Sequence, residues 1–396
     1  MSLPLRIAYA MINCNRRDGT ARAVNEVAER MASKHKVHLF ARRAEEIDLS
    51  KIKWHRMPGL SWPALLDFTT YYALAKLAIS RRCFDIIHSI GINAAAANVI
   101  TIQNIQPAKC KAFSQQSEHS RISVARKFSR RLYLKTTAII ERKAYSHRPM
   151  HTPPLFLPVS RGVEKDLRSH YDIGPAPVRI IPNAADTNIF KPLDPAERES
   201  WRQANGFHPK DIILIFAGGE WGRKGLDIAI RTLGKVPHPN VKLFVAGNDP
   251  DLRGFESLAS ELGVRNRVIF GGFRRDIPAV LGASDIFFFP SRYEAFSLAT
   301  IEAAACGLPI VATRINGTED FINPGENGVF IEQNAEHAAR ALHPLVLNAG
   351  LRKAMGRSAR RLVETRYTWD RVAAMTESAY LEYLEEFANK CVPLQK

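Results

Sequence analysis

Short runs of apolar residues alternate along the chain with segments in which apolar residues recur every three or four positions. The runs, such as Leu5 to Ala10 (which contains Arg6), residues 212–217 and residues 310–313, are short and largely apolar. Such runs are typical of strands buried on both faces of a parallel sheet. Residues 21–33 follow the first run and have the apolar spacing of a helix. Strands that alternate with helices predict an α/β protein with parallel sheets.

The alternation of strands and helices begins twice, first near residue 5 and again at residues 212–217. The chain has 396 residues, more than one hydrophobic core usually supports. Its 46% of hydrophobic and 24% of charged residues fit a globular protein. We therefore predict two doubly wound, Rossmann-like domains at residues 1–190 and 211–371. A polar, proline-bearing linker at residues 191–210 is expected to join them.

The most informative stretch runs from Pro290 to Thr313, PSRYEAFSLATIEAAACGLPIVAT. It follows an apolar strand and contains a turn, a helix that Gly307 ends, and a further strand, so it is a βαβ unit. Glu294 and Glu302 lie eight residues apart, just before this helix and along it. Open α/β sheets bind ligands at the carboxyl edge where such a helix begins. As a spacing alone, the pair is more typical of surface glutamates on an ordinary helix.

The start of this helix has groups that suit an anion or the oxygens of a sugar. The backbone N–H groups of Phe296, Ser297 and Leu298 have no partner inside the helix. Glu294 is placed to accept hydrogen bonds from hydroxyl groups, and Glu302 to accept them from the two hydroxyls of a ribose.

As a whole, residues 290–313 resemble the signature of the retaining GT-B glycosyltransferases of family 4, or group 1. The Arg223-Lys224-Gly225 sequence resembles the lipopolysaccharide-type branch of that family. Proline and serine, then Glu-Ala-Phe, a second Glu and a Gly-Leu-Pro stop stand at the family's positions, with Ser297 where glycine is usual. The resemblance implies two Rossmann-like domains that face each other across a cleft, with the nucleotide mostly on the second. It also implies that a C-terminal helix, at about residues 372–396, packs back on the first domain.

Two further segments carry the same resemblance. Residues 181–192, IPNAADTNIFKP, resemble the family's hinge. Residues 218–227, GGEWGRKGLD, are rich in glycine, which allows close approach to the backbone. They also hold two adjacent cations, Arg223 and Lys224, that suit a diphosphate. A solvent-exposed turn is the plainer interpretation of such a loop.

The first half of the chain matches the family less closely. Its first loop has a single glycine, Gly19, and does not match a G-x-G-x-x-G fingerprint. The resemblance implies that Gly19 approaches the donor diphosphate. Gln103 stands where the family often has a histidine that contacts the donor sugar, and His88 or Asn104 is a candidate to compensate. For His88, a packed or hydrogen-bonded structural role is an equal alternative.

The resemblance therefore implies metal-independent, retaining transfer of a hexose-type sugar from a nucleotide diphosphate donor, expected to be a UDP-sugar. The expected acceptor is a glycan or glycolipid, as in cell-surface polysaccharide or lipopolysaccharide synthesis. No cofactor and no bound metal is expected. The expected catalytic residues are Glu294, Lys224 and Arg223. The expected substrate-binding residues are Gly19, His88, Gln103, Asn104, Gly218, Gly219, Gly272, Phe273, Arg274, Ala295, Phe296, Ser297, Leu298 and Glu302.

The chain is strongly basic, with a formal net charge of +17, which fits anionic substrates, an anionic membrane surface or nucleic acid. Residues 109–148 contain eleven Lys and Arg residues against two Glu. A basic amphipathic helix over residues 121–148 can lie on anionic lipid. A core-packed helix with a solvated basic face is the equal alternative. Nucleic acid is disfavoured because no recognised binding module accompanies the charge.

The five cysteines are scattered without a C-x-x-C pair, which favours free thiols in a reducing compartment. No signal peptide and no stretch of about 18 apolar residues is recognised. We therefore expect a cytoplasmic protein that is at most peripheral on the inner face of the plasma membrane. Two other functions stay open: a non-catalytic GT-B scaffold that binds anionic membrane, and a GT-B phosphorylase or epimerase.

Overall fold

A computed structural model describes residues 3–16, 19–59, 64–108, 110, 124–147 and 151–387, and for residues 124–131 it describes the backbone alone. The chain divides into two compact units. The first comprises Met1–Pro182 together with Trp369–Lys396, and the second comprises Asn183–Thr368. The second unit is therefore inserted, in sequence, between two parts of the first.

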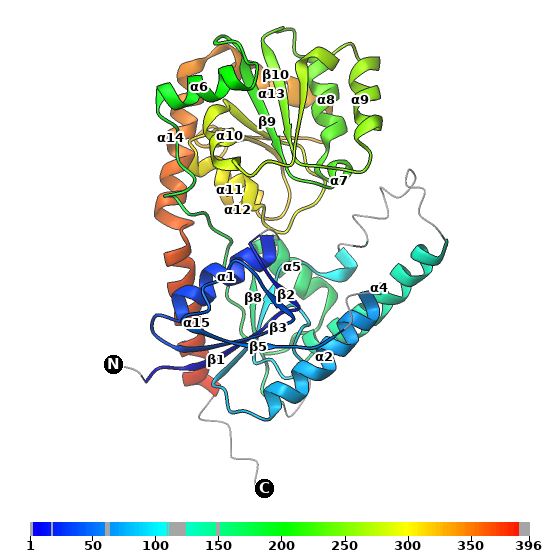
Figure 1. Ribbon diagram of the computed structural model, residues 1–396, viewed down its shortest axis with the longest axis vertical. Helices are drawn as coiled ribbons and strands as arrows, with labels where there is room; N and C mark the ends of the chain where they lie inside the picture. The colour runs from blue at the N-terminus through cyan, green and yellow to red at the C-terminus, as the bar shows by residue number, and fades with distance from the viewer. Residues whose placement is uncertain are drawn as a thin grey trace. The chain divides into compact units, whose positions relative to one another are not determined.

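The first unit is built on a six-stranded sheet in which every pair of neighbouring strands is parallel (Figure 1). In sheet order its strands are β5 (Ile52–Arg56), β3 (Lys36–Ala41), β1 (Arg6–Ala10), β6 (Ile86–Ile90), β7 (Val99–Ile102) and β8 (Leu155–Pro158). Its helices are α1 (Gly19–Met31), α2 (Ala64–Ser80), α4 (Val124–Tyr145), α5 (Arg161–His170) and α15 (Trp369–Phe387). A small parallel pair, β2 (Asn13–Cys14) and β4 (Arg43–Ala44), lies beside the main sheet.

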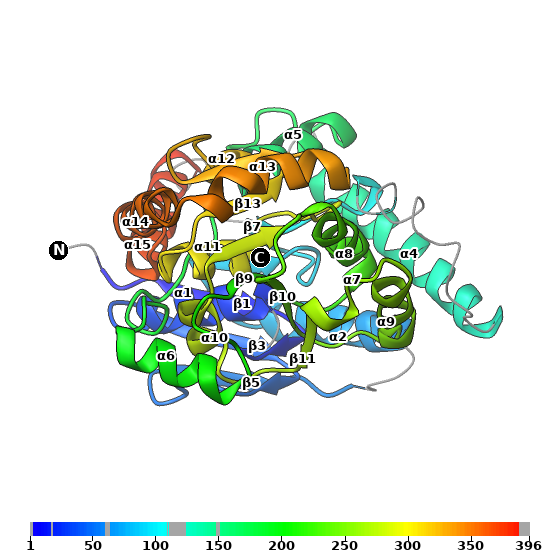
Figure 2. The same ribbon diagram turned by 90° about the horizontal axis from the view of Figure 1, so that it is seen from above.

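The second unit repeats this architecture. Its sheet, also parallel throughout, runs in the order β11 (Val268–Gly272), β10 (Val241–Ala246), β9 (Ile212–Ala217), β12 (Ile286–Phe289), β13 (Ile310–Thr313) and β14 (Gly328–Ile331). The helices are α6 (Pro195–Ala204), α7 (Trp221–Lys224), α8 (Leu226–Lys235), α9 (Leu252–Glu261), α10 (Ile277–Ala283), α11 (Leu298–Ala305), α12 (Thr318–Phe321), α13 (Ala335–Leu347) and α14 (Ala349–Arg366), with a short 3₁₀ turn at Arg265–Arg267. Figures 1 and 2 show α8 and α9 on one face of this sheet and α10 and α11 on the other.

Both sheets have the strand order 3-2-1-4-5-6 when the strands are counted along their own unit. This is the order of a Rossmann fold, so the predicted fold class is confirmed. The strands β9, β10, β12 and β13 are almost completely buried, which explains their continuous apolar sequences. Because the strand order reverses between β9 and β12, the loops that follow these two strands diverge and leave room for a ligand.

The segment predicted as a linker, residues 191–210, contains the ten-residue helix α6 and lies inside the second unit. Asp194 caps this helix by accepting hydrogen bonds from the backbone N–H groups of Ala196 and Glu197, and Pro195 occupies its first turn. Arg202 on α6 is buried and forms an ion pair with Asp285, which directly precedes β12. The segment is therefore a structural part of the second unit.

The helix α15 belongs to the first unit and packs along α1. The Tyr380 hydroxyl joins it to the sheet: Tyr380 Oη lies 3.1 Å from Tyr9 Oη and 2.5 Å from His88 Nδ1. The other ring nitrogen of His88 lies 2.6 Å from Thr101 Oγ1. His88 is 4% exposed, and burial lowers its pKa to about 3. The His88 imidazole is therefore neutral and committed to the interior of the first unit.

This shift predicts a loss of stability in acid. The pKa of His88 in the folded chain lies below the value of about 6.5 in an unfolded chain, so the unfolded state binds more protons between these two values. The stabilisation is complete above pH 6.5 and is lost, at up to roughly 1.4 kcal/mol per pH unit, as the pH falls toward 3. We expect urea unfolding at pH 7 and pH 5 to show a smaller loss for His88→Gln than for the wild type. The exposed variant His170→Gln should retain the wild-type loss; equal losses in all three proteins would contradict the prediction.

The basic segment of the first unit corresponds mainly to α4, which packs beside α2 (Figure 1). Residues 121–123 and 148 lie outside the described residues, as do the side chains of residues 124–131. Contact between this segment and anionic lipid therefore stays a prediction. In the described part of the chain, no helix combines the length and the apolar character needed to cross a membrane.

Candidate functional site

The carboxyl ends of β9 and β12 hold the residues that the sequence singles out in the second unit. Residues 218–225 follow β9, and Pro290 to Glu294 follow β12. Because these are the two strands between which the strand order reverses, the two loops border the position where open α/β sheets bind ligands.

The loop after β9 folds tightly because two glycines occupy backbone conformations with positive φ. Gly218 has φ 120° and Gly225 has φ 77°, and a side chain at Gly225 would overlap the carbonyl oxygen of Pro290. Between them the chain forms the single helical turn α7, which the buried side chain of Trp221 anchors through a 2.9 Å hydrogen bond from its Nε1 to Gly218 O. Glu220 has the left-handed conformation that is uncommon outside glycine. This geometry turns Arg223 and Lys224 toward the loop after β12.

Glu294 accepts a hydrogen bond from each of these cations. Its Oε1 lies 2.7 Å from Arg223 Nη1 and 2.8 Å from Lys224 Nζ. The three side chains are only 12–14% exposed. Lys224 Nζ also stands 5.0 Å above the centre of the Phe289 ring, a favourable cation–π distance. The three residues predicted as catalytic therefore form one cluster.

The electrostatics of this cluster favour charged side chains. Burial acts to raise the pKa of Glu294, but the charges of Lys224 and Arg223 outweigh it, so its pKa lies below the ordinary value. Burial acts to lower the pKa of Arg223, and Glu294 and Glu220 raise it above the ordinary value. Two cations thus face one buried carboxylate, while Glu220, which also pairs with Arg223, is largely exposed. An anionic group of a ligand that reaches this cluster can bind by sharing the two cations with Glu294 and Glu220.

The helix α11 begins beside this cluster. Ser297 caps it by accepting a 3.3 Å hydrogen bond from Thr300 N, and Leu298 is its first residue. Phe296 is buried, and its carbonyl oxygen accepts a 3.0 Å hydrogen bond from Asn183 Nδ2. Glu302 lies along the same helix and is only 5% exposed, so it is not the surface glutamate of an ordinary helix.

Three of the expected substrate-binding residues, Gly272, Phe273 and Arg274, lie at the end of β11 and just beyond it, at the same edge of the sheet. Gly272 ends β11 with φ 63°, and the Phe273 side chain that follows is 67% exposed. Arg274 forms two hydrogen bonds with Asp276, at 2.7 and 2.6 Å, and stands 5.8 Å from the centre of the Trp201 ring. The Arg274 guanidinium is thus held by contacts with the protein, whereas the Phe273 side chain is exposed to solvent.

One residue that holds the site together was not predicted. Arg292 donates hydrogen bonds of 2.8 Å from Nη1 and Nη2 to the two carboxylate oxygens of Asp227, and Nη1 also contacts Gly222 O at 2.5 Å. It therefore ties the loop after β12 to the loop after β9. Both residues stood within the motifs noted above, but only the fold shows that they meet.

The substrate-binding residues predicted in the first unit lie at three places in its fold. Gly19 is the first residue of α1, and Gln103 and Asn104 directly follow β7 at partly exposed positions. His88 is enclosed by Tyr380 and Thr101, which supports the structural alternative considered for it. A role for these residues toward the donor stays a prediction.

An Asp-x-Asp triplet, Asp249-Pro250-Asp251, stands between β10 and α9. Its Asp249 carboxylate accepts hydrogen bonds from Trp221 N at 2.9 Å and from Asp251 N at 3.0 Å. The Asp249 carboxylate thus fixes the loop that carries Lys224. Within the described ranges, no three His, Cys, Asp or Glu side chains are grouped closely enough to hold a metal ion.

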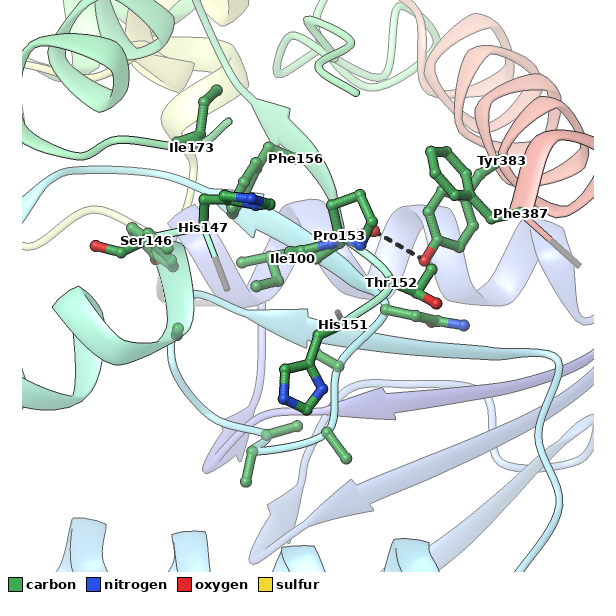
Figure 3. Close-up of a pocket in the computed structure, with 18 of the residues that line it drawn as sticks. Ile100, Ser146, His147, His151, Thr152, Pro153, Phe156, Ile173, Tyr383 and Phe387 are labelled. Carbon is green, nitrogen blue, oxygen red and sulfur yellow. Dashed lines mark hydrogen bonds between the residues drawn. The ribbon is translucent and has the colours of Figure 1, made fainter. Parts of the chain in front are cut away.

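A separate cavity of about 630 Å³ lies in the first unit. Figure 3 shows Ile100 and Phe156 on its strands, His147 near the end of α4, and Tyr383 donating a hydrogen bond to the carbonyl of Pro153. Its walls come largely from segments that precede β6, β7 and β8, that is, from the amino edge of the sheet. Because ligands of open α/β sheets bind at the carboxyl edge, this cavity is a weaker candidate than the cluster around Glu294.

Comparison with known proteins gives matches to two family models. Residues 17–189 match the model described as Glycosyltransferase Family 4, and residues 197–362 match the model described as Glycosyl transferases group 1. The chain is 32% identical over 206 residues to lipopolysaccharide glucosyltransferase WaaG of Escherichia coli, an alignment that covers 50% of this chain and 55% of WaaG. It is 31% identical over 235 residues to D-inositol 3-phosphate glycosyltransferase of Mycobacterium marinum, covering 56% of this chain and 49% of that protein. The chain thus spans about half the length of these relatives.

Solved structures agree on the fold. The crystal structure of WaaG superposes with a TM-score of 0.76 at 24% identity, covering 95% of this chain and 99% of that one. The structure of HepE from Anabaena in complex with UDP and glucose superposes with a TM-score of 0.73 at 16% identity, covering 96% of this chain and all of that one.

Proposed function

Since the chain belongs to the group 1 glycosyltransferases of family 4, we propose that it transfers a hexose-type sugar from a nucleotide diphosphate donor, such as a UDP-sugar, to a glycan or glycolipid. The observation that carries this proposal is the cluster of Glu294, Arg223 and Lys224 at the carboxyl ends of β9 and β12. The structure of HepE with UDP and glucose supports the choice of donor.

The proposed transfer begins when the diphosphate of the donor departs as an anion. When the bond between the anomeric carbon and the diphosphate breaks, negative charge grows on the departing oxygens. Lys224 and Arg223 are fixed in advance beside Glu294, so they stabilise this charge with little rearrangement. The amides at the start of α11 offer further donors.

Glu294 has a second proposed role once the donor binds. The diphosphate then shares the two cations, and the Glu294 carboxylate accepts hydrogen bonds from hydroxyls of the sugar. Glu302, buried along α11, is proposed to accept the ribose hydroxyls. We propose a retaining transfer in which the acceptor attacks from the face that the diphosphate leaves. No metal is proposed, because the cations perform the role that a metal ion has elsewhere.

The acceptor and the location are proposed on a different basis. The relationship to lipopolysaccharide glucosyltransferase WaaG supports an acceptor in the synthesis of cell-surface glycans. The net charge of +17 suits an anionic acceptor and work at the inner face of the plasma membrane. At this location, an enzyme that acts in the cytoplasm can reach a glycolipid that is anchored in the membrane.

Thermal unfolding in the presence of nucleotides tests the proposal. UDP, GDP and ADP are each added to the pure protein, and a ligand at about 100 times its dissociation constant should raise stability by roughly 2.7 kcal/mol. We expect a shift with one of the three, UDP by preference, and its loss in Glu302→Gln.

The variant Glu261→Gln, at an exposed position of α9, is the matched control and should keep the shift. If no nucleotide raises the unfolding temperature of the wild type, the transferase proposal fails and the scaffold alternative gains support. A shift that survives in Glu302→Gln would refute the proposed role of this carboxylate.

A further inference from the structure

Three arginines gather at the carboxyl edge of the first unit's sheet. Arg42 and Arg43 follow β3, and Arg56 ends β5, the strand beside it. Together with residues 57–59 they line a cavity of about 470 Å³, a size typical of small-molecule sites. The cavity lies at the carboxyl ends of parallel strands, where α/β folds bind ligands. None of these arginines takes part in the site of the second unit.

Arg42 forms the fixed wall of this cavity. It is only 9% exposed and forms an ion pair with Asp67 of α2, whose carbonyl oxygen lies 3.5 Å from Arg42 Nη2. Gly59 allows the guanidinium to approach so closely that a side chain there would overlap it. The position of Arg42 is therefore set by the fold before any ligand arrives.

Arg43 and Arg56 differ from Arg42 in two respects. Both are exposed, and neither side chain has an ion pair or hydrogen bond with any residue that the structure describes. The strand register pairs Arg56 with Ala41, two positions before Arg43, so both arginines stand at the carboxyl ends of the neighbouring strands β3 and β5. Both line the same cavity, so an anion bound there can pair with both guanidinium groups.

We propose that Arg43 and Arg56, backed by Arg42, bind a phosphate group on the acceptor. A guanidinium presents parallel N–H groups that match phosphate oxygens. The charge of a phosphate is also large enough to neutralise two unpaired cations. The cavity is larger than a phosphate ion, so it also holds the sugar to which the phosphate is attached. The assignment to the acceptor rests on the proposed function, because the donor diphosphate is there assigned to Lys224 and Arg223 of the second unit.

Calorimetric titration with inorganic phosphate, glucose 6-phosphate and glucose tests this site in the full chain. We expect both phosphates to bind and glucose not to bind. In Arg43→Gln and in Arg56→Gln the affinity for glucose 6-phosphate should fall at least about tenfold, the loss of one charge-assisted contact. The variant Arg81→Gln, an exposed arginine outside the cavity, should bind as the wild type does.

The result that would overturn the proposal is equal affinity for glucose 6-phosphate in the wild type and in both cavity variants. Vesicles of phosphatidylglycerol provide a second arm. If both arginines are needed for vesicle binding but not for sugar phosphate binding, the phosphate belongs to a lipid head group and the proposed acceptor subsite is refuted. The UDP-induced shift serves as the independent readout: its absence in the wild type refutes the proposed function and leaves phosphate binding by these arginines intact.

Discussion

Sugar transfer by Lys224→Ala is expected to be about a hundredfold to a thousandfold slower than by the wild type. Lys224 Nζ lies 2.8 Å from Glu294 Oε1 in a cluster that is largely shielded from water. Removing one fixed donor from a site that stabilises growing negative charge has an effect of about this size in other enzymes. The ground-state affinity for the nucleotide should change less, because the charge on the diphosphate is greatest when the bond to the sugar breaks.

Release of UDP from a UDP-sugar, measured with and without acceptor, provides the rate. Lys235→Ala is the matched control, since Lys235 stands at the end of α8, is exposed, and pairs only loosely with Glu336 at 3.4 Å. The control should retain the wild-type rate. A Lys224→Ala protein that releases UDP as fast as the control would show that this cation does not stabilise the departing diphosphate.

The largest expected loss of stability comes from Asp285→Ala, at about 3–5 kcal/mol. Asp285 Oδ2 accepts hydrogen bonds from Arg202 Nη2 at 2.5 Å and from Ile213 N at 2.8 Å, and Oδ1 accepts one from Arg198 Nη2 at 2.7 Å. The Arg202 side chain is only 3% exposed. Without the carboxylate, the buried Arg202 cation keeps only its hydrogen bonds to the carbonyl oxygens of Ala283 and Asp211, and Ile213 N loses this acceptor.

Urea unfolding followed by tryptophan fluorescence measures this loss. The control is Glu336→Ala, which breaks the exposed pair with Lys235 and should change the free energy of unfolding by less than about 1 kcal/mol. A similarly small change for Asp285→Ala would mean that α6 is held by other contacts. Such a result would also restore the view of residues 191–210 as a loosely attached linker.

The case of α6 shows where reasoning from apolar periodicity fails. The helix, PAERESWRQA, has few apolar residues, and one of its anchors to the unit is a buried arginine. When the burial of an arginine depends on an ion pair with a distant aspartate, the sequence around it has no apolar pattern that reveals the burial. The Asp-Pro pair at residues 194 and 195, however, is a recognisable sequence signal for a helix that begins at Pro195.

More of the site than of this helix could be predicted from the sequence. Arg223, Lys224, Glu294 and the start of α11 lie within two short motifs, each local in sequence, and the alternation of strands placed both motifs at one edge of a sheet. What the sequence does not reveal is long-range pairing. The bond between Arg292 and Asp227 spans 65 positions, and the contact between His88 and Tyr380 spans 292. Such contacts follow from the topology, and no local pattern encodes them.

The insertion of the second unit within the first has a consequence for synthesis on the ribosome. The chain leaves the first unit after Pro182 and returns to it at Trp369, and the two crossings are joined where Ala185 N donates to Tyr367 O at 3.0 Å. The helix α15, which covers α1 and supplies Tyr380 to His88, is therefore the last described element to be translated. A nascent chain can complete the second unit first, because that unit is contiguous in sequence. Until α15 has been translated, the sheet of the first unit lacks this helix, and His88 lacks the Tyr380 hydroxyl. The first unit therefore begins to be translated before the second unit, but its fold can be completed only after the second unit has been translated.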